Sequence, residues 1–222
     1  ALNELKNLLD NYESGMIMTQ GVNTVIAGRP NAGKSTLMNM LSGKEKSIVT
    51  HIEGTTRDIV ENSVRLGTLV LHLSDTAGLR ESDDVVEAIG IKKALERIDT
   101  SSLVLAVFDS SRELDGDDKM LIDACKGKKA VAVINKTDLS PAIDTEEIEN
   151  NFESSVYISA KNNTGLKELE NAVKNILGVE EFDSSAPLIA NQRQKLCIQK
   201  AYENISEALS AAELGLTYDA VN

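Results

Sequence analysis

The sequence GRPNAGKS at residues 28–35 constrains the fold of this chain more than any other segment. An apolar run, residues 22–27, precedes it, and a helix-like run, residues 36–41, follows it. Glycines in such a loop let backbone N–H groups turn toward an anion, and the following helix adds the positive end of its dipole. An incidental lysine in a glycine turn would rarely have both flanks correct. The segment therefore predicts a phosphate-binding loop between a buried strand and a helix.

The residues of this loop would divide the work of holding a nucleotide's phosphates. The candidates for phosphate contact are Asn31, Ala32, Gly33, Lys34, Ser35 and Thr36. The Lys34 ammonium would reach the β- and γ-phosphates, and the Ser35 hydroxyl would hold Mg²⁺. Lys34 is also a catalytic candidate, because a cation stabilises the charge that develops on a transferring phosphoryl group.

Short apolar runs alternate with amphipathic segments from residue 22 onward. The runs expected to form buried strands are 22–27, 69–74, 103–109, 130–135 and 155–159. Residues 59–66 alternate apolar and polar side chains before Gly67, which predicts a hairpin with an antiparallel edge strand. The expected helices cover residues 34–41, 86–97, 116–125, 146–152 and 166–177. This order predicts an α/β fold with a mostly parallel, six-stranded sheet and helices on both faces.

Both ends of the chain carry helical patterns of their own. Apolar residues between Leu2 and Tyr12 recur at helical spacing, and Gly15 is expected to end that helix. A longer helix is expected after an acidic linker and Pro187. Neither helix buries its apolar face alone, so we expect them to pack on each other or on parts of a longer protein. The predicted domains are a helical segment at 1–18, the α/β domain at 19–180, and a linker with a helical segment at 181–222.

Composition narrows the classes of partner and compartment. The net charge of −12 argues against direct binding of nucleic acid, which needs clustered lysine and arginine. No apolar run approaches membrane-spanning length, and the first residues lack the pattern of a signal peptide. Cys125 and Cys197 lie far apart without metal-ligand or redox spacing, which is typical of thiols in a reducing compartment. We therefore expect a cytoplasmic protein that interacts with no membrane.

The sequence NKTD at residues 135–138 indicates which base is bound. It stands where a central strand should end. The Asp138 carboxylate only accepts hydrogen bonds, so it can take both the ring N–H and the exocyclic amine of guanine. Adenine lacks that pair of donors and would leave the acceptor unpaired. Asn135 would support the base edge, and the Lys136 side chain would cover the face of the base. The expected ligands are thus GTP and GDP.

A shorter motif, SAK at residues 159–161, ends the next predicted strand. Ala160 would present its N–H to the guanine O6, with Ser159 and Lys161 on either side. The place of the motif, after a strand and before a helix, supports the guanine assignment.

Two further motifs fit the sensing of a γ-phosphate. DTAG at residues 75–78 closes the run at 69–74, so Asp75 would hold the Mg²⁺ shell through water and the Gly78 N–H would contact the γ-phosphate. Loss of that contact on hydrolysis would release the following segment. GTTRD at residues 54–58 lies in a long polar loop, where Thr56, or alternatively Thr55, would supply a second hydroxyl to Mg²⁺.

These five motifs, in this order, resemble the translation-factor-related class of P-loop GTPases, whose fold is Ras-like. The segments GRPNAGKS, GTTRD and DTAGLRESDDVVEAIGI are similar to the MnmE (TrmE) family of bacterial tRNA-modification GTPases. The resemblance covers the whole chain and implies a GTPase domain with pieces of a surrounding helical domain, truncated from a longer protein. It further implies that the longer protein takes part in 5-carboxymethylaminomethyl modification of the tRNA wobble uridine, with a flavin-dependent partner of the MnmG type.

The resemblance also assigns the groups that act in hydrolysis. Leu79 follows DTAG directly, where many small GTPases carry the glutamine that orients water. In the acidic segment that follows, Glu87 matches the family's water-positioning residue. The alternative reading of that segment is a solvated acidic helix start. With Lys34 and Gly78, Glu87 completes the expected catalytic set.

The family resembles cation-activated GTPases, which place K⁺ where an arginine finger would sit. Its K⁺ ligands match Asn31 and the carbonyls of Thr50 and Ile52, and the site forms as two GTPase domains pair. Arg57 and Arg80 are the alternative cations. The resemblance therefore implies K⁺-stimulated hydrolysis with nucleotide-dependent dimerisation.

Two other functions fit parts of the sequence. Ribosome-assembly GTPases such as Der and Era share most of these motifs, but the helix that begins near Asn191 matches neither of their following domains. A non-catalytic module that binds GTP only to set a partner's shape is the alternative from another class, because Leu79 can perform no water chemistry.

Overall fold

The computed structural model describes residues 2–43, 63–73, 97–179, 189 and 191–213. The chain divides into two compact units. Residues 21–180 form an α/β unit, and residues 1–20 together with 181–222 form a helical unit.

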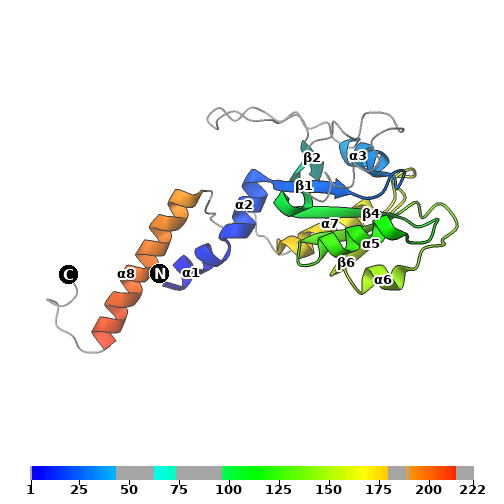
Figure 1. The fold of residues 1–222 in the computed structure, drawn as a ribbon. Coiled ribbons are helices and arrows are strands. Elements are labelled where there is room, and N and C mark those ends of the chain that lie inside the picture. Colours follow the sequence, from blue (N-terminus) through cyan, green and yellow to red (C-terminus); the bar gives the residue numbers. More distant parts are fainter. Residues whose placement is uncertain (1, 44–62, 74–96, 180–188, 190, 214–222) are drawn as a thin grey trace. The chain divides into compact units, whose positions relative to one another are not determined.

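Six strands in the described part of the α/β unit form one sheet (Figure 1). In spatial order they are β2 (Ser63–Leu66), β3 (Leu69–Leu73), β1 (Val22–Ala27), β4 (Leu103–Asp109), β5 (Ala130–Asn135) and β6 (Ser154–Tyr157). β2 pairs antiparallel with β3, and every other neighbouring pair is parallel. This confirms the predicted mostly parallel sheet with one antiparallel edge.

The strand bounds match the prediction best where the apolar runs are longest. β1, β4 and β5 begin and end where the sequence predicted, and every residue of β4 and β5 is buried. β6 ends at Tyr157, so the expectation that it reaches Ser159 was wrong. Ser159 instead forms an isolated bridge with Thr164, because the chain turns there and its backbone bonds go to the turn. The expected strand residues 59–62 and Ser74 lie outside the described residues.

Four helices of this unit are described in full. They are α3 (Lys34–Ser42), α5 (Gly116–Cys125), α6 (Thr145–Glu149) and α7 (Leu166–Leu177). α7 buries Leu169, Ala172 and Val173 on one stripe and ends at Leu177, and the C-cap that follows is Gly178, whose φ of 68° suits a glycine. α6 is shorter than predicted and does not reach Phe152. The ring of Phe152 is buried edge-on against Phe108, with 5.8 Å between centroids. Most of the helix expected at 86–97 lies outside the described residues.

The side chains of β4 alternate between two buried faces. Val104, Ala106 and Phe108 pack into one core with side chains of α5 and with Ile148 of α6. The intervening residues Leu103, Leu105 and Val107 face the other way and are also fully buried. On the described elements, α3 contacts β2 and α7 contacts β5 and β6. A sheet covered on both faces leaves the carboxyl ends of its parallel strands as the natural place for a site.

The helical unit contains α1 (Leu2–Asp10), α2 (Tyr12–Gln20) and α8 (Gln192–Glu213). α1 contacts α8, and the Lys195 ammonium lies 4.4 Å from the centroid of the Tyr12 ring, so the end helices pack on each other as expected. The prediction that Gly15 ends the first helix was wrong. Gly15 lies inside α2 and donates its N–H to Asn11 O, because an interior glycine costs only about 1 kcal/mol when the helical bonds continue. Among the described helices, none is long and apolar enough to span a membrane.

Candidate nucleotide-binding site

The predicted phosphate loop follows β1 and leads directly into α3. Its backbone departs from ordinary geometry at Asn31, with φ of 60°, and at Gly33, with φ of 95°. A Cβ on Gly33 would collide with the side chain of Asn135, so this position needs glycine on two grounds. Gly33 is also the N-cap of α3, and no described side chain caps the helix there. The first turn of α3 is therefore suited to receive an anion.

Lys34 is positioned by the loop that it belongs to. Its Nζ donates to Arg29 O at 2.6 Å, and burial lowers the pKa of the ammonium to about 8. A pKa of about 8 favours the charged form of Lys34 at neutral pH, and the Arg29 carbonyl holds the ammonium at the loop. From this position the ammonium can exchange its hydrogen bond to Arg29 O for hydrogen bonds to phosphate oxygens without a large movement of the backbone.

Asn135, at the end of β5, joins two of the predicted loops. Its Nδ2 donates to Ala32 O at 3.0 Å, and its Oδ1 accepts from Ala160 N at 3.0 Å. The residue is 2% exposed. Both polar ends of the Asn135 amide are thus engaged within the protein, where they join the two loops. The Ala160 N–H is likewise engaged, and a guanine O6 would have to share it.

Lys136 has φ of 65° and extends its side chain to the end of β4. Its Nζ lies 2.6 Å from Asp109 Oδ2, and the other oxygen of Asp109 accepts from Ser111 N and Oγ. Burial alone would raise the pKa of Asp109, but the hydrogen bonds from Lys136 and Ser111 outweigh it and lower the pKa. Asp109 was not among the predicted site residues, and it fixes the lysine expected to cover the base.

Asp138 lies at the surface with its carboxylate oriented by the next loop. Ser159 Oγ donates to Asp138 Oδ1 at 2.6 Å and accepts from Asn162 N at 3.2 Å. The Ser159 hydrogen bond lowers the pKa of Asp138, and the charges of Lys161 and Lys136 act in the same direction. The structure therefore presents an ionised, exposed acceptor in the loop after β5, and guanine recognition requires an acceptor of this kind.

Arg29 is a second site residue that sequence reasoning missed. Its guanidinium pairs with Asp115 at 2.7 Å and with Asp118 at 3.2 Å, both at the start of α5. The arginine is adjacent to the predicted glycines, but its partners are more than eighty residues away and carry no local signal.

Several predicted site residues lie outside the described residues. They are Thr50, Ile52, Thr55, Thr56, Arg57, Asp75, Gly78, Leu79, Arg80 and Glu87. Of the predicted Mg²⁺ ligands, only Ser35 is described, in the first turn of α3. Within the described ranges, no group of three or more His, Cys, Asp or Glu side chains is placed to hold a metal ion.

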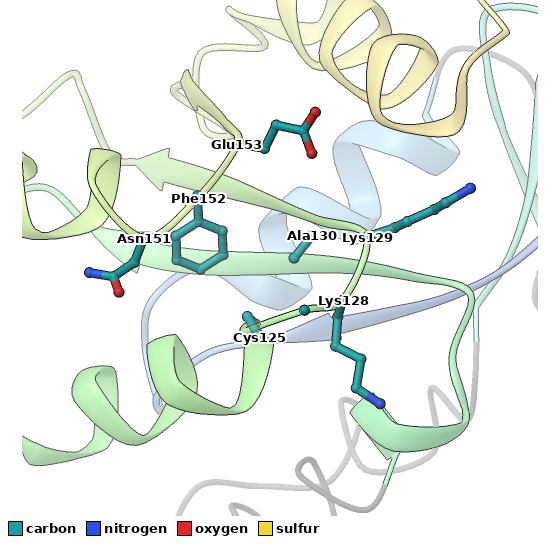
Figure 2. A pocket seen from close by; sticks show the side chains of 8 residues that line it. Cys125, Lys128, Lys129, Ala130, Asn151, Phe152 and Glu153 are labelled. Atoms are coloured by element: carbon teal, nitrogen blue, oxygen red, sulfur yellow. The ribbon is translucent and has the colours of Figure 1, made fainter.

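A separate hollow of about 360 Å³ lies at the amino ends of β5 and β6, opposite the strand ends that lead into the predicted site (Figure 2). Figure 2 shows the Phe152 ring beside Ala130 and Cys125, while Lys128 and Lys129 point away from one another. Burial raises the pKa of the Cys125 thiol to about 12, which makes it unreactive. This hollow is not part of the predicted nucleotide site.

Comparison with known proteins assigns the part of the chain that contains the phosphate loop to one family. A model of the family described as 50S ribosome-binding GTPase matches residues 23–136, about half of the chain. The matched region runs from β1 through the phosphate loop to Lys136.

Two curated relatives are similar over nearly the whole chain. The tRNA modification GTPase MnmE of Finegoldia magna is 37% identical over 219 residues, and that of Clostridioides difficile is 38% identical over 223 residues. Each alignment covers 98% of this chain but 48% of the relative. The chain thus spans about half the length of the curated relatives it matches.

Among solved structures, the G domain of the FeoB iron transporter of T. maritima is 23% identical. The superposition has a TM-score of 0.48 and covers 70% of this chain and 98% of the FeoB G domain.

Proposed function

This chain belongs to the 50S ribosome-binding GTPase family and is a GTPase, and on that premise we propose how its described site recognises GTP and what the domain serves. We propose that Asp138 recognises guanine, that hydrolysis depends on Mg²⁺ and K⁺, and that the domain serves in tRNA modification.

The observation that carries the first part is the geometry of Asp138. Its carboxylate is exposed and accepts a hydrogen bond from Ser159 Oγ at 2.6 Å. Ala160, the next residue, bonds to Asn135, and Asn135 bonds in turn to Ala32 of the phosphate loop. A pair of donors on one base edge matches an ionised carboxylate, and guanine offers that pair whereas adenine does not. Lys34 and the first turn of α3 supply the positive field for the phosphates.

The Mg²⁺ site is proposed from the donors that the chain offers, and the K⁺ site from the resemblance to cation-activated GTPases. Ser35 stands beside Lys34 in the first turn of α3, where its hydroxyl suits Mg²⁺, with Thr56 and Asp75 as the remaining ligands. Mg²⁺ would neutralise charge on the phosphates. Asn31, held at a φ of 60°, and the carbonyls of Thr50 and Ile52 would hold K⁺. K⁺ would supply the charge that an arginine finger supplies elsewhere, as two GTPase domains pair.

The biological role rests on the curated relatives, which are named as tRNA modification GTPases. We infer that this chain is the GTPase part of a cytoplasmic protein that drives modification of the tRNA wobble uridine with a flavoprotein partner of the MnmG type. The net charge of −12 disfavours direct tRNA binding by these residues, so the tRNA chemistry would lie elsewhere in the longer protein.

A single-turnover measurement of GTP hydrolysis tests the mechanism. Rates are compared in KCl and NaCl at matched ionic strength, for the wild type, Glu87→Ala and the acidic neighbour control Asp83→Ala. We expect faster hydrolysis in KCl, and a loss of about a hundredfold in Glu87→Ala but not in the control.

Each outcome decides one part of the mechanism. Equal rates in the two salts would refute the K⁺ site. An unchanged rate in Glu87→Ala would refute the assignment of Glu87 as the residue that positions water. GTP binding without turnover in either salt would favour a passive nucleotide-dependent module.

A further inference from the structure

Arg29 contributes to the site through its backbone and its side chain at once. Its carbonyl accepts from Lys34 Nζ at 2.6 Å and from Ala32 N at 3.4 Å, so it lies under the cation of the phosphate loop. Its guanidinium, only 10% exposed, pairs with Asp115 Oδ2 at 2.7 Å and with Asp118 Oδ2 at 3.2 Å. One residue therefore links the lysine of the loop to the start of α5.

The two aspartates are themselves held firmly. Asp115 Oδ1 accepts from the N–H groups of Asp117 and Asp118, and Asp118 Oδ2 accepts from Asp115 N, which is a reciprocal capping box. The Asp118 side chain is 4% exposed, and burial raises its pKa although the Arg29 charge opposes that rise. The carboxylates that receive Arg29 are thus held by hydrogen bonds at the start of the helix.

Neither ion pair contributes much net stability. The pair with Asp118 is buried, so the cost of desolvation offsets the attraction, and the Asp115 side chain is 43% exposed, so solvent screens its pair. What the two pairs do provide is geometry, since a guanidinium fork that meets two fixed carboxylates has little freedom of orientation. The fixed side chain in turn restricts the Arg29 carbonyl, and that carbonyl sets the place of the Lys34 ammonium.

We propose that Arg29 is a positioning residue for nucleotide binding: its ion pairs with Asp115 and Asp118 hold the phosphate loop so that Lys34 is presented to the phosphates. The inference rests on the proposed binding of guanine nucleotides at this loop. It assigns to the start of α5 a part in phosphate binding, although neither aspartate is among the proposed phosphate ligands.

The test measures GDP affinity in the presence of Mg²⁺ for Arg29→Ala, Arg29→Lys and the control Lys119→Ala. Lys119 lies on α5, next to Asp118, and makes an exposed ion pair with Glu147 at 3.7 Å. Removal of the Lys119 side chain should therefore leave the GDP affinity unchanged. We expect about tenfold weaker binding in Arg29→Ala, and an intermediate loss in Arg29→Lys because an ammonium cannot serve both carboxylates as a fork does.

A double-mutant cycle with Lys34→Ala separates positioning from general loosening of the fold. If Arg29 acts through Lys34, Arg29→Ala costs about tenfold in the wild type but less than about threefold in the Lys34→Ala background, with GDP titrated into the millimolar range. Asp118→Asn keeps the shape of the side chain and removes its charge, so it serves as the second variant if Arg29→Ala does not fold.

The outcomes distinguish this inference from the proposed function. Failure of the wild type to bind GDP would refute the proposed function itself. Wild-type binding with affinities of Arg29→Ala and Asp118→Asn within twofold of it, or equal losses in both Lys34 backgrounds, would overturn the positioning role alone.

Discussion

Replacement of Asn135 by alanine is the sharpest test of how the loops are joined. The substitution removes the donor to Ala32 O and the acceptor for Ala160 N, each at 3.0 Å. Ala32 and Ala160 are 0% and 4% exposed, so water cannot easily replace the lost partner. Leaving a buried polar group without a partner costs about 1–3 kcal/mol. Two such groups predict a loss of about 2–6 kcal/mol in the free energy of unfolding.

Asn135→Asp changes a single atom of this arrangement and carries its own pH dependence. One oxygen still accepts from Ala160 N, but the other faces Ala32 O, so acceptor opposes acceptor unless the acid is protonated. Burial raises the folded-state pKa of such a carboxyl above its unfolded value of about 3.9. The destabilisation should therefore be smallest at low pH and grow as the pH rises through the folded-state pKa.

Urea unfolding of the domain measures both variants. Asn151→Ala is the matched control, because Asn151 Nδ2 also donates to a backbone carbonyl, Glu147 O, but at an exposed position. We expect less than about 0.5 kcal/mol of destabilisation there. A loss below about 1 kcal/mol in Asn135→Ala, or equal losses in Asn135→Ala and the control, would refute the account of Asn135 as a buried junction.

Three further predictions concern single groups of the described residues. Asp138→Asn replaces an acceptor by an amide and should weaken GDP binding at least about tenfold by calorimetry, whereas unchanged affinity would argue against its contact with guanine. Because burial lowers the pKa of Lys34 to about 8 and bound phosphate would raise it again, GDP binding should take up a proton above pH 8 and weaken as the pH rises. Calorimetry in buffers of different ionisation enthalpy measures that uptake, and its absence at pH 8.5 would count against the buried lysine. Cys197 is exposed and should react with a thiol reagent in the native protein, whereas Cys125, with its pKa raised to about 12, should react only after unfolding. Modification of both thiols in the native state would contradict this difference.

The sequence predicted best what local pattern determines. β1, β4 and β5 are mostly apolar runs that end at loops with polar or glycine residues, so their bounds followed largely from the hydrophobic pattern. The glycine rule failed at Gly15, because a single unfavourable residue does not end a helix whose backbone bonds continue on both sides.

The contacts that connect the site could not be predicted in the same way. Asn135 bonds to Ala32 across 103 positions, and Arg29 bonds to Asp118 across 89. Such pairs depend on the order of the strands in space rather than on any spacing along the chain. NKTD predicts a base-binding motif, whereas nothing in its spacing predicts the junction that Asn135 makes between two loops.

Calorimetric titration with GDP and with ADP, in Mg²⁺ and at equal protein concentration, tests the central claim most directly. A phosphate loop alone would bind both nucleotides, whereas the Asp138 carboxylate should favour the guanine base by about a hundredfold or more. Tight GDP binding with ADP binding weaker by that factor is the predicted result. Equal affinities for the two nucleotides, or no uptake of GDP, would contradict the account.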